Sequence, residues 1–70
     1  MNDQLIAIIQ KNTREEIRVG MGEFKGHPLV SIRVWVTAED LPTKKGLAFS
    51  PTLLPDVIAA LEAAQKEAGG

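Results

Sequence analysis

The chain has 70 residues, of which 44% are hydrophobic, and its eight basic and nine acidic side chains give a net charge of −1. This length and composition indicate a single globular domain over residues 1–70, and the near-balance of charge excludes a polybasic tail. The absence of cysteine excludes disulfides and thiolate chemistry, and with a single histidine we expect no metal site and no cofactor.

The apolar residues are too scattered for a membrane span. The longest strictly apolar run is Leu5–Ile9, whereas a helix needs ~20 residues to cross a bilayer. The first residues, Met1-Asn2-Asp3, lack the basic start of a secretory signal. We therefore expect a protein that is kept in the cytoplasm and has no membrane partner.

Two strands are predicted in the first third of the chain. Leu5–Gln10 is apolar but short, so it fits a strand or a helix; we favour a strand that is followed by a bend at residues 11–13. Glu16–Met21 alternates with a period of two, which is typical of a half-buried strand. Whether residues 1–10 pair within the sheet or swap into a partner chain stays open.

The most regular alternation lies at Leu29–Thr37, which predicts the third strand. One face of this strand carries Val30, Ile32, Val34 and Val36. The other face carries Leu29, Ser31, Arg33, Trp35 and Thr37. The glycines and the proline of the segment from Gly22 to Pro28 predict a turn, so the second and third strands should form an antiparallel hairpin.

The second half of the chain predicts a short strand and a helix. Residues 37–43 are polar and contain a proline, which predicts a loop, and Lys45–Phe49 predicts the last strand. Ser50-Pro51 predicts the start of a helix, because serine suits the N-cap and proline suits the first helical position. Pro55 removes one early helical hydrogen bond, so we expect a loose or 3₁₀-like first turn. The apolar stripe of the helix comprises Leu54, Val57, Ile58, Leu61, Ala64 and Ala68.

These elements predict an α+β fold in the order β-β-β-β-α, with an antiparallel sheet followed by one C-terminal helix. We expect the helix to cover the face of the sheet that carries Val30, Ile32, Val34 and Val36. The opposite face then has nothing else in the chain to cover it, so it should meet solvent or a partner.

The predicted open face combines cations with aromatic rings. This face and the turns beside it carry Arg18, Phe24, Lys25, His27, Arg33, Trp35, Lys44 and Lys45. In proteins that bind single-stranded nucleic acids, cations follow the phosphates and flat rings stack on unpaired bases. Residues 11–50 hold seven basic and five acidic side chains, whereas residues 51–70 hold one basic and three acidic ones. The sheet segment is thus net basic and the helix net acidic, which favours steering of a polyanion to the sheet.

Single residues of this set also have structural interpretations. Trp35 could be a half-buried packing residue, and Phe24 could plug the edge of the core. Arg33 could pair with Glu16 across the strands. His27 could be an ordinary turn residue. The clustering of the whole set on one face favours binding.

No catalytic constellation is visible in the sequence. It contains no nucleophile elbow and no glycine-rich phosphate loop. The adjacent carboxylates Glu15-Glu16 and Glu39-Asp40 would point in opposite directions in a strand. We therefore expect a binding protein that is not an enzyme.

Several short motifs, taken in order, resemble a known family. They are Lys11–Val19, Glu23–Val30, Ile32–Trp35, Pro42–Leu47 and the segment from Ser50 to Leu61. With them the chain resembles the bacterial branch of the transcriptional coactivator family of positive cofactor four. The resemblance implies a curved four-stranded sheet, one helix, and a homodimer whose paired channels take single-stranded or melted DNA.

The resemblance also implies which residues contact DNA. The turn aromatic and lysine of the family correspond to Phe24 and Lys25, the next basic position to His27, the strand arginine to Arg33, and the lysine of the last strand to Lys45, with Lys44 beside it. His27 is the weaker cation, because an imidazole is mostly neutral at pH 7.

Three positions depart from the family pattern. Gly22 stands where relatives have an arginine, and Glu15 stands near a family lysine. Trp35-Val36 replaces a pair of aromatics, so Trp35 either stacks on bases or packs in the core.

The helix gives a separate argument for a dimer. Small side chains on the helix leave a flat surface that a second helix can approach closely. These side chains are Ala59, Ala60, Ala63 and Ala64. A chain of this size buries only ~60% of its unfolded surface, so a partner copy would add stability.

We therefore predict a homodimeric, sequence-tolerant single-stranded DNA-binding protein that acts as a transcription cofactor or in DNA maintenance. In a bacterium it would be nucleoid-associated, with RNA polymerase or transcription factors as further partners. Two alternatives stay open. One is a protein–protein interaction module of the transcription machinery, and the other is an RNA-binding chaperone, because phosphates and base faces are common to DNA and RNA.

Overall fold

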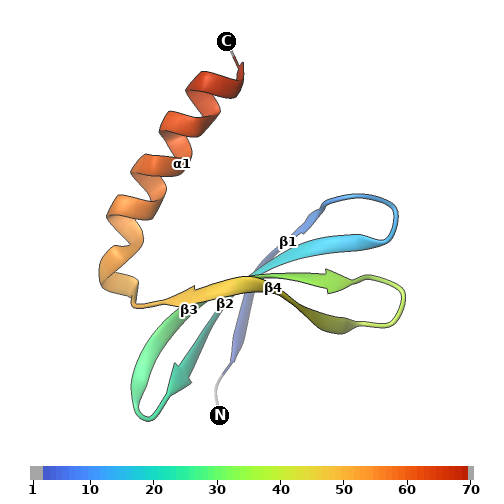
Figure 1. The fold of residues 1–70 in the computed structure, drawn as a ribbon. Coiled ribbons are helices and arrows are strands. Elements are labelled where there is room, and N and C mark those ends of the chain that lie inside the picture. The colour runs from blue at the N-terminus through green and yellow to red at the C-terminus, as the bar shows by residue number, and fades with distance from the viewer. Residues whose placement is uncertain (1–2, 70) are drawn as a thin grey trace.

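Four antiparallel strands form one sheet in sequence order, and a helical segment follows them (Figure 1). The computed structural model describes residues 3–69. The elements are β1 (Gln4–Gln10), β2 (Glu15–Phe24), β3 (His27–Val36), β4 (Leu41–Phe49), the 3₁₀ turn η1 (Pro51–Leu53) and α1 (Leu54–Gly69). The predicted α+β class and the β-β-β-β-α order are confirmed.

The β2–β3 hairpin is longer than the sequence predicts. Its turn consists of Lys25 and Gly26 alone, with φ angles of 52° and 82°. Two successive positive φ angles are the mark of a type I′ turn, whose twist matches that of the flanking strands. The predicted turn from Gly22 to Pro28 was therefore too wide, because both strands continue up to the two-residue turn and Phe24 pairs with His27.

The last strand begins at Leu41, so the predicted loop over residues 37–43 was also too long. The register between β3 and β4 shifts between Arg33 and Trp35, where β4 carries extra residues. At this shift the Thr43 hydroxyl donates to the carbonyl of Val34 at 2.8 Å and accepts from the amide of Lys45 at 3.1 Å. The Thr43 side chain thus replaces the missing ladder hydrogen bonds, which lets a polar segment remain in the strand.

The first strand is confirmed and forms an edge of the sheet. β1 pairs with β2 from Gln4 opposite Met21 to Gln10 opposite Glu16, with a shift of register between Leu5 and Ala7. The bend that follows is held by Asn12, whose Oδ1 accepts hydrogen bonds from the amides of residues 14 and 15. Residues 3–10 therefore lie in, or directly before, the sheet of their own chain; residues 1–2 lie outside the described part.

The helix begins as the sequence predicts. The Ser50 hydroxyl accepts a hydrogen bond from the amide of Thr52 at 3.3 Å, and the carbonyl of Ser50 accepts one from the amide of Leu53 at 3.0 Å. The 3₁₀ turn η1 precedes α1, and Pro55 lies in the first turn of α1. In the part of the chain that the structure describes, no helix is long and apolar enough to cross a bilayer.

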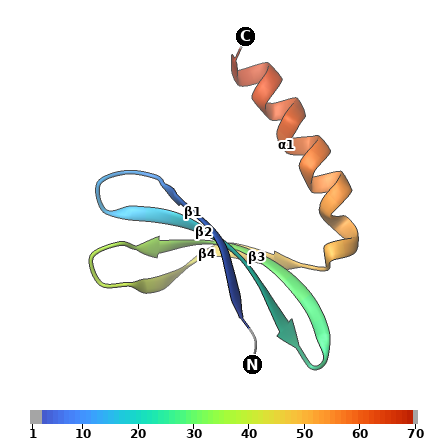
Figure 2. The ribbon, with the colours of Figure 1, turned by 180° about the vertical axis from the view of Figure 1, so that it is seen from behind.

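The position of α1 contradicts the sequence prediction. Figures 1 and 2 show from both sides that α1 projects away from the sheet, and none of its residues is buried. Only Ser50 separates β4 from η1, so no loop is present that could reverse the chain and lay the helix across the sheet. In the single chain the face with Val30, Ile32, Val34 and Val36 is therefore not covered by α1.

The sheet is twisted, which Figure 1 shows in the divergent ends of the strands, and the 3₁₀ turn η1 contacts β3. Among residues 3–69, Val30 is the buried apolar residue, with 4% of its surface exposed, and Glu16 is the buried charged residue, with 5% exposed. The middle of β2 and β3 is half-buried, whereas β1 and most of β4 are exposed.

Candidate nucleic-acid interface

The pairing of β2 with β3 decides which side chains share a face. Arg18 lies opposite Arg33, Glu16 lies opposite Trp35, and Phe24 lies opposite His27. Side chains alternate along a strand, so these residues point to one side of the sheet, which we call the Trp35 face. The structure thus brings together five predicted site residues, which are Arg18, Phe24, His27, Arg33 and Trp35.

A groove of about 470 Å³ lies on the Trp35 face. Its floor contains a row of small residues that are paired across three strands: Gly20 lies opposite Ser31, and Ser31 lies opposite Ala48. Larger side chains stand around this floor and include Leu5, Arg18, Phe24, Leu29 and Trp35. The groove therefore results from short side chains in mid-sheet between large ones.

The small residues of the floor were missed by the sequence prediction. Gly20 was assigned to the correct face of its strand, and Ser31 shares a face with Trp35, but neither was identified as part of a site. The available signal was the combination of alternation and hairpin pairing, which places both at one level of the sheet.

The two groove aromatics differ in their surroundings. Phe24 ends β2 beside the turn, is 61% exposed, and has Nζ of Lys25 5.4 Å from its ring centroid. Trp35 is half-buried, and the guanidinium carbon of Arg18 lies 4.0 Å from its ring centroid. Both rings line the groove, so Phe24 does not plug a core and Trp35 is packed on one side and accessible on another.

Arg18 is held by two carboxylates. Its Nε donates to Oε2 of Glu16 at 2.5 Å, and its Nη2 donates to Oδ1 of Asp40 at 2.5 Å. These hydrogen bonds, first that to Asp40 and then that to Glu16, raise the pKa of Arg18 above its ordinary value. Because Glu16 and Asp40 together carry one more charge than Arg18, this cluster offers no excess positive charge to a phosphate.

Arg33 has a different partner from the one considered in the sequence. Its Nη1 donates to the carbonyl of Thr43 at 2.9 Å, in β4. The pairing with Glu16 does not form, because Glu16 lies opposite Trp35 and binds Arg18 on its own strand. Arg33 is half-buried and has further donor nitrogens on its guanidinium.

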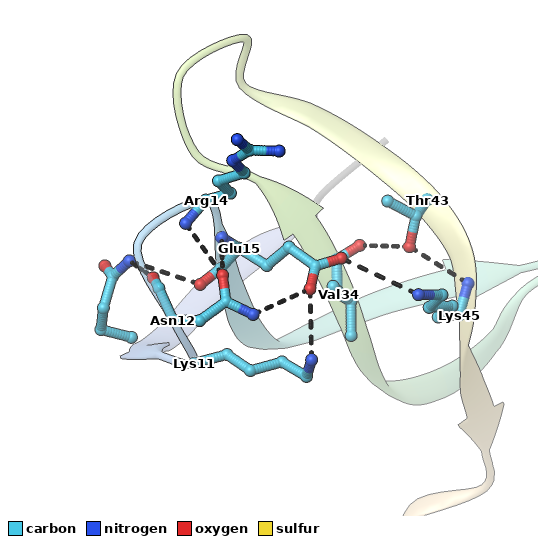
Figure 3. A network of polar contacts seen from close by, with 8 residues as sticks. Lys11, Asn12, Arg14, Glu15, Val34, Thr43 and Lys45 are labelled. Atoms are coloured by element: carbon cyan, nitrogen blue, oxygen red, sulfur yellow. Dashed lines mark hydrogen bonds and ion pairs between the residues drawn. The ribbon is translucent and has the colours of Figure 1, made fainter.

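Lys45 is drawn to the other side of the sheet. Its Nζ lies 4.0 Å from Oε2 of Glu15, and Glu15 also accepts from Nζ of Lys11 at 3.2 Å and from Nδ2 of Asn12 at 3.1 Å (Figure 3). Glu15 precedes Glu16 in β2, so it points away from the Trp35 face. The structure therefore separates Lys45 from the groove aromatics.

The hydrogen bonds of Glu15 also affect its ionisation. Those from Asn12 and Lys11 lower the pKa of Glu15 below its usual value of 4.5, and the charges of Lys11 and Lys45 act in the same direction. Through its contacts with Lys11 and Asn12 on one side and Lys45 on the other, Glu15 joins the β1–β2 bend to β4.

The remaining predicted site residues are exposed. Lys25 lies in the hairpin turn and Lys44 in β4. On α1 the predicted dimer residues Ala59, Ala60, Ala63 and Ala64 are exposed, as are the larger Ile58 and Leu61. Within residues 3–69 no group of three or more acidic or histidine side chains is placed to hold a metal ion.

Comparison with known proteins identifies the family. The family model described as Transcriptional Coactivator p15 (PC4) matches residues 11–60. No match was found among curated protein sequences. The chain is similar to crystal structures of BPSL1147, a PC4 homolog from Burkholderia pseudomallei, at 30% sequence identity.

The similarity covers nearly the whole of both proteins. In the tetragonal crystal form the TM-score is 0.84, and the match covers 91% of this chain and 98% of the homolog. In the orthorhombic form the TM-score is 0.86, and the match covers 94% and 93%. From the family model and from this relative, the chain belongs to the PC4 family of transcriptional coactivators.

Proposed function

We propose that this protein binds single-stranded and melted DNA along the Trp35 face, without strong sequence preference, as a transcription cofactor or DNA-maintenance protein of the bacterial cytoplasm. One observation carries the proposal: Phe24 and Trp35, eleven positions apart in the sequence, line the same open groove. Base–aromatic stacking contributes about 1–3 kcal/mol per base and accepts every base. Membership of the PC4 family supports the same function.

The charges suggest how a strand would lie. The charged residues of the groove are Asp3, Arg18 and Glu23, so the groove itself is not basic. A polyanion is therefore better placed with its bases in the groove and its phosphates outside it. The basic residues proposed to contact phosphates beside the groove are Lys25, His27, Arg33 and Lys44. Lys45 lies on the other side of β4, so it would contact a phosphate where the strand passes over the edge of the sheet that β4 forms.

We also propose that the protein is a homodimer joined through α1. The helix contacts little of its own chain, and Ile58 is 50% exposed and Leu61 59% exposed. Ala60 and Ala63 would let a second copy approach closely. Sedimentation velocity is expected to give the dimer mass for the wild-type protein and the monomer mass for Ala60→Glu, since a buried carboxylate is costly.

Binding to a fluorescein-labelled oligo-dT, followed by anisotropy, tests the DNA-binding proposal. The double variant Phe24→Ala/Trp35→Ala should weaken binding by about tenfold or more, because it removes two stacking surfaces. Leu41→Ala is the matched control, because Leu41 is similarly exposed (54%) and pairs with Val36 on the opposite face. Affinity should fall with salt with a log–log slope of about −0.7 for each phosphate contacted.

Two results would contradict the proposal. Equal affinities of the folded double variant and Leu41→Ala would show that the rings do not bind bases. Stronger competition by oligo-U than by oligo-dT would instead identify RNA as the ligand.

A further inference from the structure

The guanidinium of Arg18 covers one side of the Trp35 indole at 4.0 Å from the ring centroid. This stack follows from the sheet register. Trp35 of β3 lies opposite Glu16 of β2. Arg18 is two residues beyond Glu16 in β2, so it is the diagonal neighbour of Trp35 on the same face of the sheet. The side chain of Arg18 is only 19% exposed, so the stack is largely shielded from solvent.

Two carboxylates fix the guanidinium in this position. Glu16 is buried, with 5% of its surface exposed, and binds Nε. Asp40 binds Nη2 from the turn between β3 and β4, where it adopts a positive φ of 53°. Aspartate tolerates this left-handed backbone better than most residues do, and in this conformation the Asp40 side chain reaches Arg18 at the groove.

The geometry points to a positioning role for Arg18, an inference that rests on the proposed function. We propose that Arg18, latched by Asp40, holds the Trp35 ring in a fixed orientation, so that the ring presents a prepared stacking surface to a base in the groove. A surface that is ordered before binding loses less side-chain entropy when the ligand arrives. Arg18 then acts through Trp35 and not through a phosphate, because its Nε and Nη2 bind carboxylates whose combined charge exceeds its own.

The variant Asp40→Asn separates this role from simple electrostatics. It removes a negative charge near the groove, which by charge alone should strengthen the binding of a polyanion. By releasing Arg18 it should instead weaken binding by about two- to fivefold, the scale of a lost exposed ion pair. Asparagine tolerates a positive φ as well as aspartate does, so the turn is retained.

Glu39→Gln is the matched control. Glu39 lies next to Asp40 in the same exposed turn, and among residues 3–69 it forms no ion pair. The control removes the same charge and leaves the latch intact, so it should bind oligo-dT as tightly as the wild-type protein or more tightly. The log–log salt slope should be unchanged in Asp40→Asn, since no phosphate contact is lost.

A second readout needs no DNA. Trp35 is the sole tryptophan, so the intrinsic fluorescence of the protein reports on this ring alone. In the free protein Asp40→Asn should increase quenching by acrylamide and shift the emission to longer wavelength, whereas Glu39→Gln should match the wild type. Arg18→Lys, which keeps the charge and removes the planar group, should behave like Asp40→Asn.

The outcomes distinguish the two proposals. If Asp40→Asn and Glu39→Gln show the same quenching, or the same DNA affinity, Arg18 does not position Trp35 and the inference is overturned. If the wild-type protein does not bind oligo-dT, the proposed function fails, and the quenching comparison alone decides whether the latch orients the ring.

Discussion

Oε2 of Glu15 lies 4.0 Å from Nζ of Lys45, although the two residues belong to strands separated by β3. The same side chain accepts hydrogen bonds from Lys11 and Asn12. One carboxylate therefore restrains two lysines, and one of them is a proposed DNA contact.

Glu15→Gln is expected to strengthen DNA binding by about twofold, because it releases both lysines and removes a nearby negative charge. The magnitude of the salt slope should rise by up to ~0.7, the contribution of one added phosphate contact. Anisotropy titrations at several salt concentrations measure both effects. Glu62→Gln, which removes the same charge from α1, is the control, and an equal gain in that variant would refute a local role for Glu15.

Stability should depend on Glu15 at acid pH. Its pKa is lowered in the folded protein, so its contribution to stability is present above the ordinary value of 4.5 and is lost as the pH falls through the lowered pKa. Thermal unfolding from pH 7 to pH 2 should show a smaller acid-induced decrease in Tm for Glu15→Gln than for the wild type. Parallel Tm curves for the two proteins would contradict this assignment.

Filling the groove floor should reduce DNA binding without unfolding the sheet. Ser31→Val places a larger side chain between Gly20 and Ala48, while valine remains favourable in a strand. We expect an affinity loss of about fivefold or more, since one base loses its stacking site. Ser31→Ala keeps the floor low and should retain wild-type affinity; a similar loss in both variants would argue against the groove as the base site.

The hairpin turn should depend on the backbone freedom of Gly26. A Cβ at this position would meet no atom within 4 Å, so Gly26→Ala tests the positive φ of 82° alone. We expect a loss of about 1 kcal/mol in the free energy of unfolding, measured in urea, and a smaller loss for Gly26→Asn. Gly69→Ala also enters open space and has no positive φ, so it should leave stability unchanged.

The sequence predicts those parts of the fold that depend on local pattern. The β-branched residues of β3 identify this strand through their alternation, and Ser50-Pro51 with Pro55 predicts the 3₁₀ entry into α1. The start of β4 was missed, because the Thr43 hydroxyl replaces the ladder hydrogen bonds that a regular strand would have. Such a side-chain hydrogen bond between strands leaves no periodic pattern in the sequence.

Features that depend on chain direction were predicted less well. The apolar stripe of α1 was placed on the sheet, but the short connection through Ser50 carries the helix away from it. The grouping of Arg18, Phe24, Arg33 and Trp35 follows from alternation and hairpin pairing. Lys45 was expected on the same face as these residues but lies on the other side of the sheet. Its position follows from the irregular register of β4, which the sequence does not reveal.

The outward course of α1 keeps the proposed association surface remote from the groove. Two copies joined by their helices would present two grooves on one particle, and a strand long enough to reach both would be retained by avidity, whereas a short oligonucleotide would occupy one groove only. Substitutions on α1 would then change the oligonucleotide length at which binding tightens, while each groove keeps its intrinsic affinity.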